Sequence, residues 1–151
     1  MANTNRKRII DILHRRSLGQ TELLPRDLSN IDLNGLDFSS LLLDATHFDH
    51  SHLRKASFRG AHLWDASFID ADLEEADFED ANLQRVNFEG AKLVHTNLKG
   101  AQLQDAIISN EQFSAAITGL SSKEKWQMGR TVTGVVFDIL RSIVKAIFTM
   151  R

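Results

Sequence analysis

The chain has 151 residues, of which 42% are hydrophobic and 25% charged, a balance that is typical of one globular domain and excludes a disordered chain. It has no cysteine, which excludes disulfide frameworks, thiolate metal sites and nucleophilic cysteine chemistry. The formal net charge of −2 gives no overall attraction to nucleic acid or to anionic membranes. We recognise no export signal and no apolar stretch long enough for a transmembrane helix, so we expect a cytoplasmic protein.

The first segment, residues 1–25, is predicted to be a capping helix and a lead-in. Residues 5–17 have a helical pattern with Ile9, Ile10 and Leu13 on one face. Basic residues fill the last turn, and Gly19 is the predicted stop. We expect this helix to cover the end of the structure that follows it.

A five-residue repeat organises the middle segment, residues 26–115. A large apolar residue stands at every fifth position from Leu28 to Phe113, and the residue two positions before it is alanine in nine of these eighteen units. The quintets ADLEE, ADFED, ANLQR and AKLVH show the pattern. A period of five matches neither the 3.6 of a helix nor the 2.0 of a strand, so the chain must turn a corner in each unit to keep these residues buried.

These quintets resemble the pentapeptide-repeat family, whose motif is alanine, aspartate or asparagine, then leucine or phenylalanine, then two variable residues. The resemblance implies an all-β solenoid, a right-handed quadrilateral β-helix of about 4.5 coils with α-helical caps at both ends. Four quintets would form each coil, so that residues 20 apart stack and phenylalanine columns face each other across the core. This fold needs no metal or cofactor, and we expect none. The predicted core includes Leu28, Phe38, Phe48, Leu53, Phe58, Leu63, Phe68, Leu73, Phe78, Leu83, Phe88 and Leu93.

The charge is divided unevenly along the chain, with +3 in residues 1–25, −9 in residues 26–115 and +4 in residues 116–151. The family's quinolone-resistance members are thought to imitate duplex DNA and occupy type II topoisomerases, so the resemblance offers DNA mimicry as an alternative function. Against it, stacking places basic residues on acidic ones, for example Arg54 on Glu74. Asp70, Asp77 and Asp80 have no basic neighbour one coil away and are predicted to form the remaining acidic surface.

Four histidines, His47, His50, His52 and His62, crowd one stretch of the repeat, and clustered imidazoles can bind zinc. All four fall at outward positions, and three have an aspartate one coil away as a hydrogen-bond partner. A convex surface also lacks the water-excluding pocket that catalytic acids and bases need. We therefore predict no metal site, no catalytic site and no enzymatic activity.

Three apolar residues fall at outward positions of neighbouring coils: Leu42, Trp64 and Ile69. Aromatic anchors beside aliphatic residues are typical of binding hot spots. Coverage by the chain's own termini is an equal alternative. The hypothesis that we carry forward is a protein-interaction scaffold or regulatory binding protein, with an unidentified protein partner and no direct contact with nucleic acid.

The last segment, residues 116–151, is predicted to be an amphipathic helical cap. Ser121 and Glu124 form a capping-box signature before an apolar periodic stretch. A helix of about 28 residues would span roughly 42 Å, whereas one side of a coil spans at most about 17 Å. The surplus apolar face favours a homodimer through this helix, with contact to a membrane surface as a lesser alternative. The residues predicted for this face include Trp126, Val136, Ile139, Leu140, Ile143 and Ile147.

Overall fold

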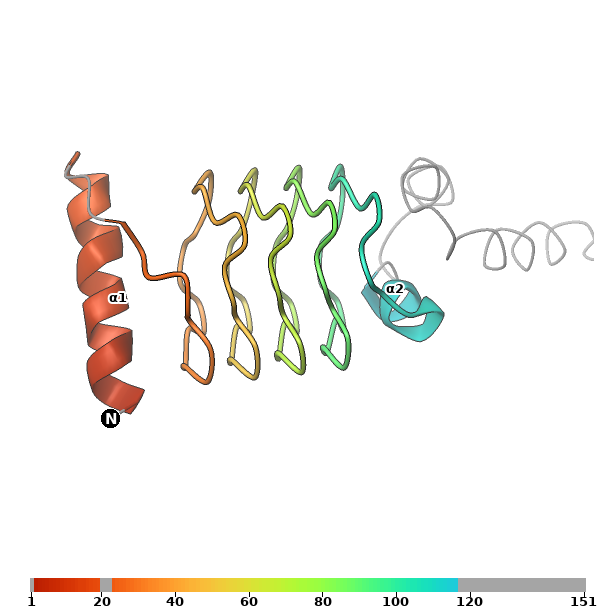
Figure 1. The fold of residues 1–151 in the computed structure, drawn as a ribbon, viewed down its shortest axis with the longest axis horizontal. Coiled ribbons are helices and arrows are strands. Elements are labelled where there is room, and N and C mark those ends of the chain that lie inside the picture. The colour runs from red at the N-terminus through yellow and green to blue at the C-terminus, as the bar shows by residue number, and fades with distance from the viewer. Residues whose placement is uncertain (1, 20–22, 117–151) are drawn as a thin grey trace, which may run out of the picture.

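The computed structural model describes residues 2–19 and 23–116 of the chain. Helix α1, Ala2–Ser17, stands at one end, a stack of coils follows, and helix α2, Asn110–Ala116, lies at the other end (Figure 1). Neither helix is long and apolar enough to cross a membrane. The surplus helical face expected beyond residue 116, which includes Trp126, lies outside the described residues.

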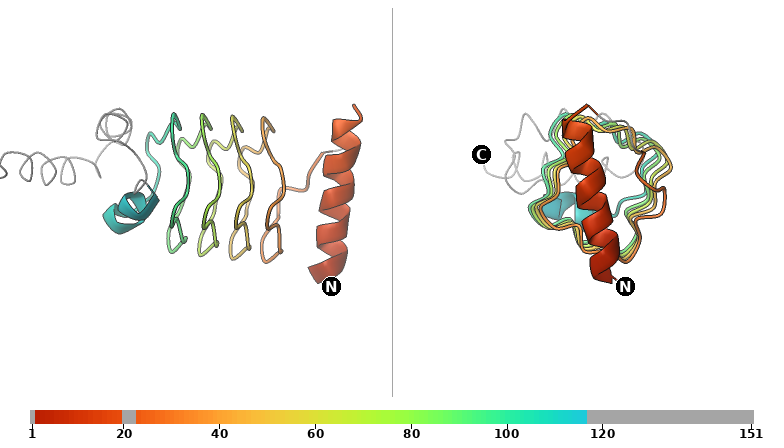
Figure 2. Two further views of the ribbon diagram at one scale, coloured as in Figure 1. Left: turned by 180° about the vertical axis from the view of Figure 1, so that it is seen from behind. Right: turned by 90° about the vertical axis from the view of Figure 1, so that its left-hand side faces the viewer.

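The coils are joined by parallel β-bridges between residues 20 apart, from Asp27↔His47 to Asn87↔Ile107. A bridge occurs once in every quintet, which gives each coil four sides and stacks the coils as a parallel β-helix (Figure 2). The Leu28 N–H donates to the His47 carbonyl at 2.8 Å, and the His47 N–H donates to the Arg26 carbonyl at 2.8 Å. The five-residue period is therefore the length of one side.

The corners explain the composition of the last position in each quintet. Every fifth residue from Asn30 to Asp105 has a positive φ, between 53° and 71°. This left-handed conformation costs an L-residue about 1–2 kcal/mol and is especially unfavourable for β-branched side chains. No valine, isoleucine or threonine stands at any of these positions.

Pro25 is the chain's one proline, and it occupies the corner position immediately before the first coil. A corner N–H normally donates to a carbonyl of the next coil, as the Asn30 N–H does to Asp49 at 2.9 Å. Proline has no N–H, and its ring holds φ near −65°, so it cannot adopt the left-handed corner. The β-helix therefore begins after Pro25.

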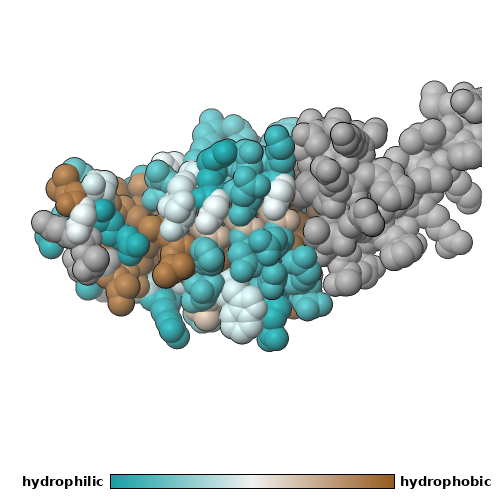
Figure 3. Space-filling model, turned by 90° about the horizontal axis from the view of Figure 1, so that it is seen from above, coloured by the Kyte–Doolittle hydropathy of each residue, from teal (hydrophilic) through white to brown (hydrophobic). Residues whose placement is uncertain are grey.

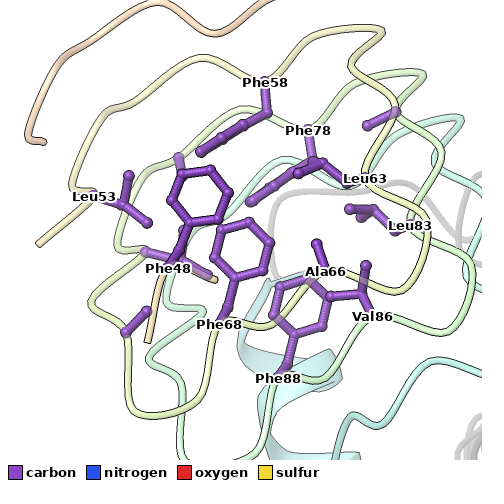
Figure 4. Packing of buried hydrophobic residues seen from close by; sticks show 14 of the residues in the cluster. Phe48, Leu53, Phe58, Leu63, Ala66, Phe68, Phe78, Leu83, Val86 and Phe88 are labelled. Carbon is purple, nitrogen blue, oxygen red and sulfur yellow. The ribbon is translucent and has the colours of Figure 1, made fainter. Parts of the chain in front are cut away.

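The core consists of the central apolar residues and the small residues beside them. Phe48, Phe68 and Phe88 form one column, with ring centroids 4.8 and 5.5 Å apart, and each ring also meets the opposite column edge to face (Figure 4). The opposite column repeats the arrangement with Phe38, Phe58 and Phe78, at 5.0 and 4.8 Å. All the central residues predicted for the core are buried. The two opposed phenylalanine columns expected from the sequence are thus present.

Helix α1 covers the open end of the first coil. Ile9 and Ile12 are 2% and 1% exposed, and the Arg6 guanidinium donates to the Asp32 carbonyl at 2.5 Å and the Asn34 carbonyl at 3.2 Å. The sequence placed Ile10 on the buried face, but Ile10 is 41% exposed. Residues 9 and 12 share a helix face, whereas residue 10 is turned about 100° away from residue 9.

The coil stack ends earlier than the repeat pattern predicts, because α2 begins at Asn110 instead of a further coil side continuing to residue 115. A capping box overrides the repeat: the Gln112 N–H donates to Ser109 Oγ at 3.2 Å, and the Ser109 N–H donates to Gln112 Oε1 at 2.8 Å. Phe113 is still buried, but from the helix. Gln112 Nε2 also donates to the Phe88 carbonyl at 2.6 Å, which ties α2 to the coil beneath it.

Candidate functional site

The outward residue after each central apolar residue has an amide N–H that needs an acceptor outside the coil-to-coil bonds. In eight of the sixteen quintets from residue 26 to residue 105, the aspartate or asparagine two positions earlier accepts it in an Asx turn. Asp77 Oδ1 accepts from the Glu79 N–H at 3.0 Å, and Asn87 Oδ1 accepts from the Glu89 N–H at 2.9 Å. This bond explains the aspartate or asparagine of the repeat.

Trp64 and Ile69 belong to quintets that lack this acceptor, since His62 and Ser67 replace the aspartate. The coil beneath supplies it instead. Asp44 Oδ1 accepts from the Trp64 N–H at 2.8 Å, and Asp49 Oδ1 accepts from the Ile69 N–H at 2.9 Å. The backbone at both apolar positions is therefore as firmly bonded as in a regular quintet. The signal was available in the sequence, as an aspartate 20 residues before each of them.

The Trp64 side chain is 41% exposed and lies against Arg85, whose guanidinium carbon is 5.2 Å from the ring centroid. Arg85 Nε is also 3.4 Å from Asp65 Oδ1. This cation–π contact holds the indole against the coil and leaves part of the ring exposed. Ile69 is half-buried on the next side of the coil.

Leu42 lies one coil beneath His62 on the same side as Trp64, and it is 74% exposed. It lines a pocket of about 260 Å³ together with Leu23, Leu24 and Leu41. Figure 3 shows hydrophobic residues gathered toward the N-terminal end and hydrophilic residues over the coils. The sequence predicted Leu42 as a neighbour of Trp64 and Ile69, but missed this pocket, because the position of Leu23 depends on how the lead-in approaches the first coil.

The acidic surface is more neutralised than the sequence predicts. The stacked pair Arg54–Glu74 is present at 2.8 Å. Asp77 was predicted to have no basic neighbour, but its Oδ2 is 2.9 Å from Arg59 Nη1, which also contacts Glu79 at 2.5 Å. Arg59 and Asp77 are 18 residues apart, so their ion pair runs diagonally between two coils. The stacking of residues 20 apart therefore does not predict it. The hydrogen bond to Asp77, and next in size the one to Glu79, raises the pKa of the Arg59 guanidinium.

Asp70 and Asp80 remain as exposed carboxylates at corners of the coil. Asp70 Oδ2 is 3.7 Å from His50 Nδ1, and Asp80 has no ion-pair partner among the residues that the structure describes. Each carboxylate lies beneath a glycine of the next coil, Asp70 beneath Gly90 and Asp80 beneath Gly100, where an added Cβ would be 2.0 Å from the Oδ1 atom. Of the three aspartates predicted to form an unpaired acidic surface, only Asp70 and Asp80 therefore remain.

The histidines are spread over the outer surface of the coils. His47 Nδ1 is 3.8 Å from Asp49 Oδ2, while His52 bridges Asp32 below and Asp72 above through the backbone. Within residues 2–19 and 23–116, no group of three or more metal-ligating side chains is placed to hold a metal ion.

Comparisons with known proteins give one consistent result. A family model described as pentapeptide repeats, in eight copies, matches residues 46–85 and 81–117. HetL from the cyanobacterium Nostoc sp. strain PCC 7120, a pentapeptide repeat protein involved in heterocyst differentiation regulation, matches at 31% identity and a TM-score of 0.52. That match covers 56% of this chain and only 39% of HetL.

A pentapeptide repeat protein of the Arabidopsis thaliana thylakoid lumen also matches, at 31% identity over 75% of this chain and 81% of that protein, with a TM-score of 0.42. The search of curated proteins found no match. The family model and the solved structures together imply that the β-helix is right-handed.

Proposed function

Since this chain belongs to the pentapeptide-repeat family, we propose that it is a non-enzymatic scaffold that binds a protein partner through the surface around Trp64. The observation that carries the proposal is the way Trp64 is held. Its amide is bonded to Asp44 at 2.8 Å, its ring lies against Arg85, and the ring remains 41% exposed. A partly exposed tryptophan on a firmly bonded backbone is typical of an interaction anchor.

The fold lowers the entropic cost of such an interaction. Each coil is bonded to its neighbours, and Leu63 beside Trp64 and Leu83 in the next coil are fully buried. A surface that is already ordered loses little conformational freedom when a partner binds. Leu42 and Ile69 extend the apolar part of this surface on the same side and the next one.

Capture of partners from the native cell, with and without crosslinking, tests this proposal. We expect Trp64→Ala to lose the captured partner while its thermal midpoint stays within about 2 °C of wild type, because the ring is not part of the core. Val94→Ala is the matched control, since Val94 occupies the same quintet position and is 42% exposed. Unchanged capture by Trp64→Ala, or equal loss in both variants, would contradict the proposal.

A second candidate function is mimicry of DNA toward a type II topoisomerase, and the −9 charge of residues 26–115 favours it. Asp70 and Asp80 are the exposed carboxylates that would carry it, whereas Asp77 is paired with Arg59. A gyrase supercoiling assay separates the two candidates. Mimicry requires inhibition by the wild type and its loss in the variant combining Asp70→Asn with Asp80→Asn.

Self-association through residues 116–151 is a separate proposal, which would make the last segment an oligomerisation cap. The apolar residues that the sequence assigns to this face lie outside the described residues, so the pattern of the sequence alone supports it. Sedimentation of the full chain tests it. A monomeric mass that persists at high protein concentration would refute the dimer.

A further inference from the structure

The five-residue pattern continues into helix α2. Residues 111–115 read EQFSA, with Phe113 at the central apolar position and an alanine at the corner position. Asn110 stands at the preceding corner, where asparagine tolerates a positive φ, as Asn30 does at 58°. The family model covers α2 as well as the coils. The sequence of α2 therefore also suits a further side of the β-helix.

The coil beneath α2 has one corner without the acceptor that a further side would supply. Every corner N–H from Asn30 to Arg85 donates to a carbonyl of the next coil. The following corner is Gly90, and its N–H has no hydrogen-bond partner among the residues that the structure describes. Its expected acceptor, the Ser109 carbonyl, accepts from the Phe113 N–H of α2 at 3.0 Å. The turn into α2 thus leaves this corner unpaired.

The central residue of the next side, Leu93, lacks an acceptor in the same way. In the coils below, each central N–H donates to a carbonyl of the next coil. Leu93 is 1% exposed, and its N–H has no partner in the described part of the chain. The other two upward groups of this side are bonded by α2. Gln112 Nε2 donates to the Ala91 carbonyl at 2.8 Å. The His95 N–H donates to the Ala115 carbonyl at 3.3 Å. Helix α2 therefore replaces only part of the bonding of a further side.

Glu111 is the residue that opposes a further side. It would stand at the inward position two residues before Phe113, where Ala71 and Ala91 of the same column are 0% and 5% exposed. A carboxylate at an inward position would lose much of its hydration. In the helix, Glu111 lies exposed in the first turn, where a negative charge is stabilised by the unpaired N–H groups. Glu111 and the capping box therefore favour the helix over the coil.

The two arrangements also differ in the surface that they present. Where the chain turns into α2, it leaves a pocket of about 620 Å³, whose lining includes Gly90, Ala91 and Gln112. Ile107, which also lines this pocket, is 56% exposed. A further side would run directly above Gly90 and Ala91 and would fill this space with backbone. The pocket therefore belongs to the helical arrangement alone.

We propose that residues 110–116 are a two-state end of the β-helix, which exchanges between helix α2 and a further coil side, with Glu111 favouring the helix. In the coil form, the N–H groups of Gly90 and Leu93 bond to the carbonyls above them, and the pocket closes. A partner that contacts this end would shift the exchange toward the form that it binds better. The inference goes beyond the proposed scaffold function and does not depend on it.

NMR of the full-length isotope-labelled chain tests the proposal through a variant that should reverse the preference. Glu111→Ala combined with Gln112→Asn gives this quintet the alanine and asparagine of the repeat motif. We expect the ¹³C shifts of residues 111–115 to change from helical to extended values. Amide exchange at Gly90 should slow by at least about tenfold, because its N–H gains an acceptor. The matched control, Glu89→Ala with Gln102→Asn, should leave both unchanged. A double variant that stays helical overturns the proposal.

Chemical exchange saturation transfer on the wild type measures whether the coil form is populated. We expect a minor state of about 0.1–10%, whose shifts for residues 111–115 match those of the double variant. Asn110→Val should abolish this state while α2 remains helical, because a β-branched residue disfavours the positive φ of a coil corner. A wild type without a minor state, or a minor state that persists in Asn110→Val, overturns the proposal.

Discussion

Phe68 and Phe58 each make four ring contacts in the core, and replacing Phe68 with leucine tests how much the phenylalanine columns contribute. Its ring stacks on Phe48 at 4.8 Å and on Phe88 at 5.5 Å, and it meets Phe58 and Phe78 edge to face at 5.7 Å each. Phe88, at the end of the same column, has only the contacts with Phe68 and Phe78. The two residues are equally buried, at 0% exposure.

The difference between the two substitutions isolates the ring contacts. Leucine and phenylalanine have similar transfer free energies, so the loss is dominated by aromatic pairs, each contributing roughly 0.5–1.5 kcal/mol beyond burial. Phe68→Leu removes four pairs and should reduce the free energy of unfolding by roughly 2–6 kcal/mol. Phe88→Leu removes two pairs and should cost roughly 1–3 kcal/mol.

Urea unfolding of the full chain, followed by circular dichroism and extrapolated linearly to water, measures both losses. Phe113→Leu is the control, because Phe113 is 1% exposed and has no ring contact in the described part of the chain. Its loss should remain below about 1.5 kcal/mol. Equal losses for Phe68→Leu and Phe88→Leu would refute the reasoning, since burial alone would then account for the phenylalanines.

Two further predictions concern single aspartates. Asp49→Ala should destabilise the chain by roughly 1–3 kcal/mol in thermal unfolding, because the Ile69 N–H loses its acceptor, whereas Asp49→Asn, which keeps an acceptor oxygen, should lose clearly less. The backbone N–H of Ser29 lowers the pKa of Asp27 in the folded chain, so the stabilisation that Asp27 provides is complete above its unfolded pKa and disappears as the pH falls through the lowered value. The unfolding free energy of Asp27→Asn should consequently fall less than that of wild type between about pH 5 and about pH 2.

The sequence predicts the β-helix well because its strongest constraint, burial of one large side chain per quintet, is periodic and local. The stacking of residues 20 apart follows from that period, and it places Phe48 on Phe68 and Arg54 on Glu74, as the structure does. The pair of Arg59 and Asp77 does not follow from this column rule, because the rule ignores long side chains that reach diagonally between coils.

The ends of the stack are harder to predict because two local signals compete there. At Ser109 and Gln112 the repeat register and a capping box overlap, and the reciprocal hydrogen bonds of the box favour the helix. At the other end, Pro25 marks the start of the β-helix. The sequence shows this only once it is known that each corner needs a positive φ and an N–H donor. The candidate surface could also be predicted only in part. The repeat gives the outward position of Trp64, but not its contact with Arg85 or the pocket near Leu42, because these depend on how side chains and the lead-in pack.

The four-sided coil also sets how such a chain can grow or shrink. Inserting one quintet would turn every later side by one position, so that phenylalanine would stack on leucine and each acceptor such as Asp49 would lie beneath the wrong amide. Inserting two quintets would restore the alternation of phenylalanine and leucine but would exchange opposite faces, separating Arg54 from Glu74. Only a whole coil preserves every column at once. The protein can therefore lengthen by duplication in steps of 20 residues, although its sequence repeats every five.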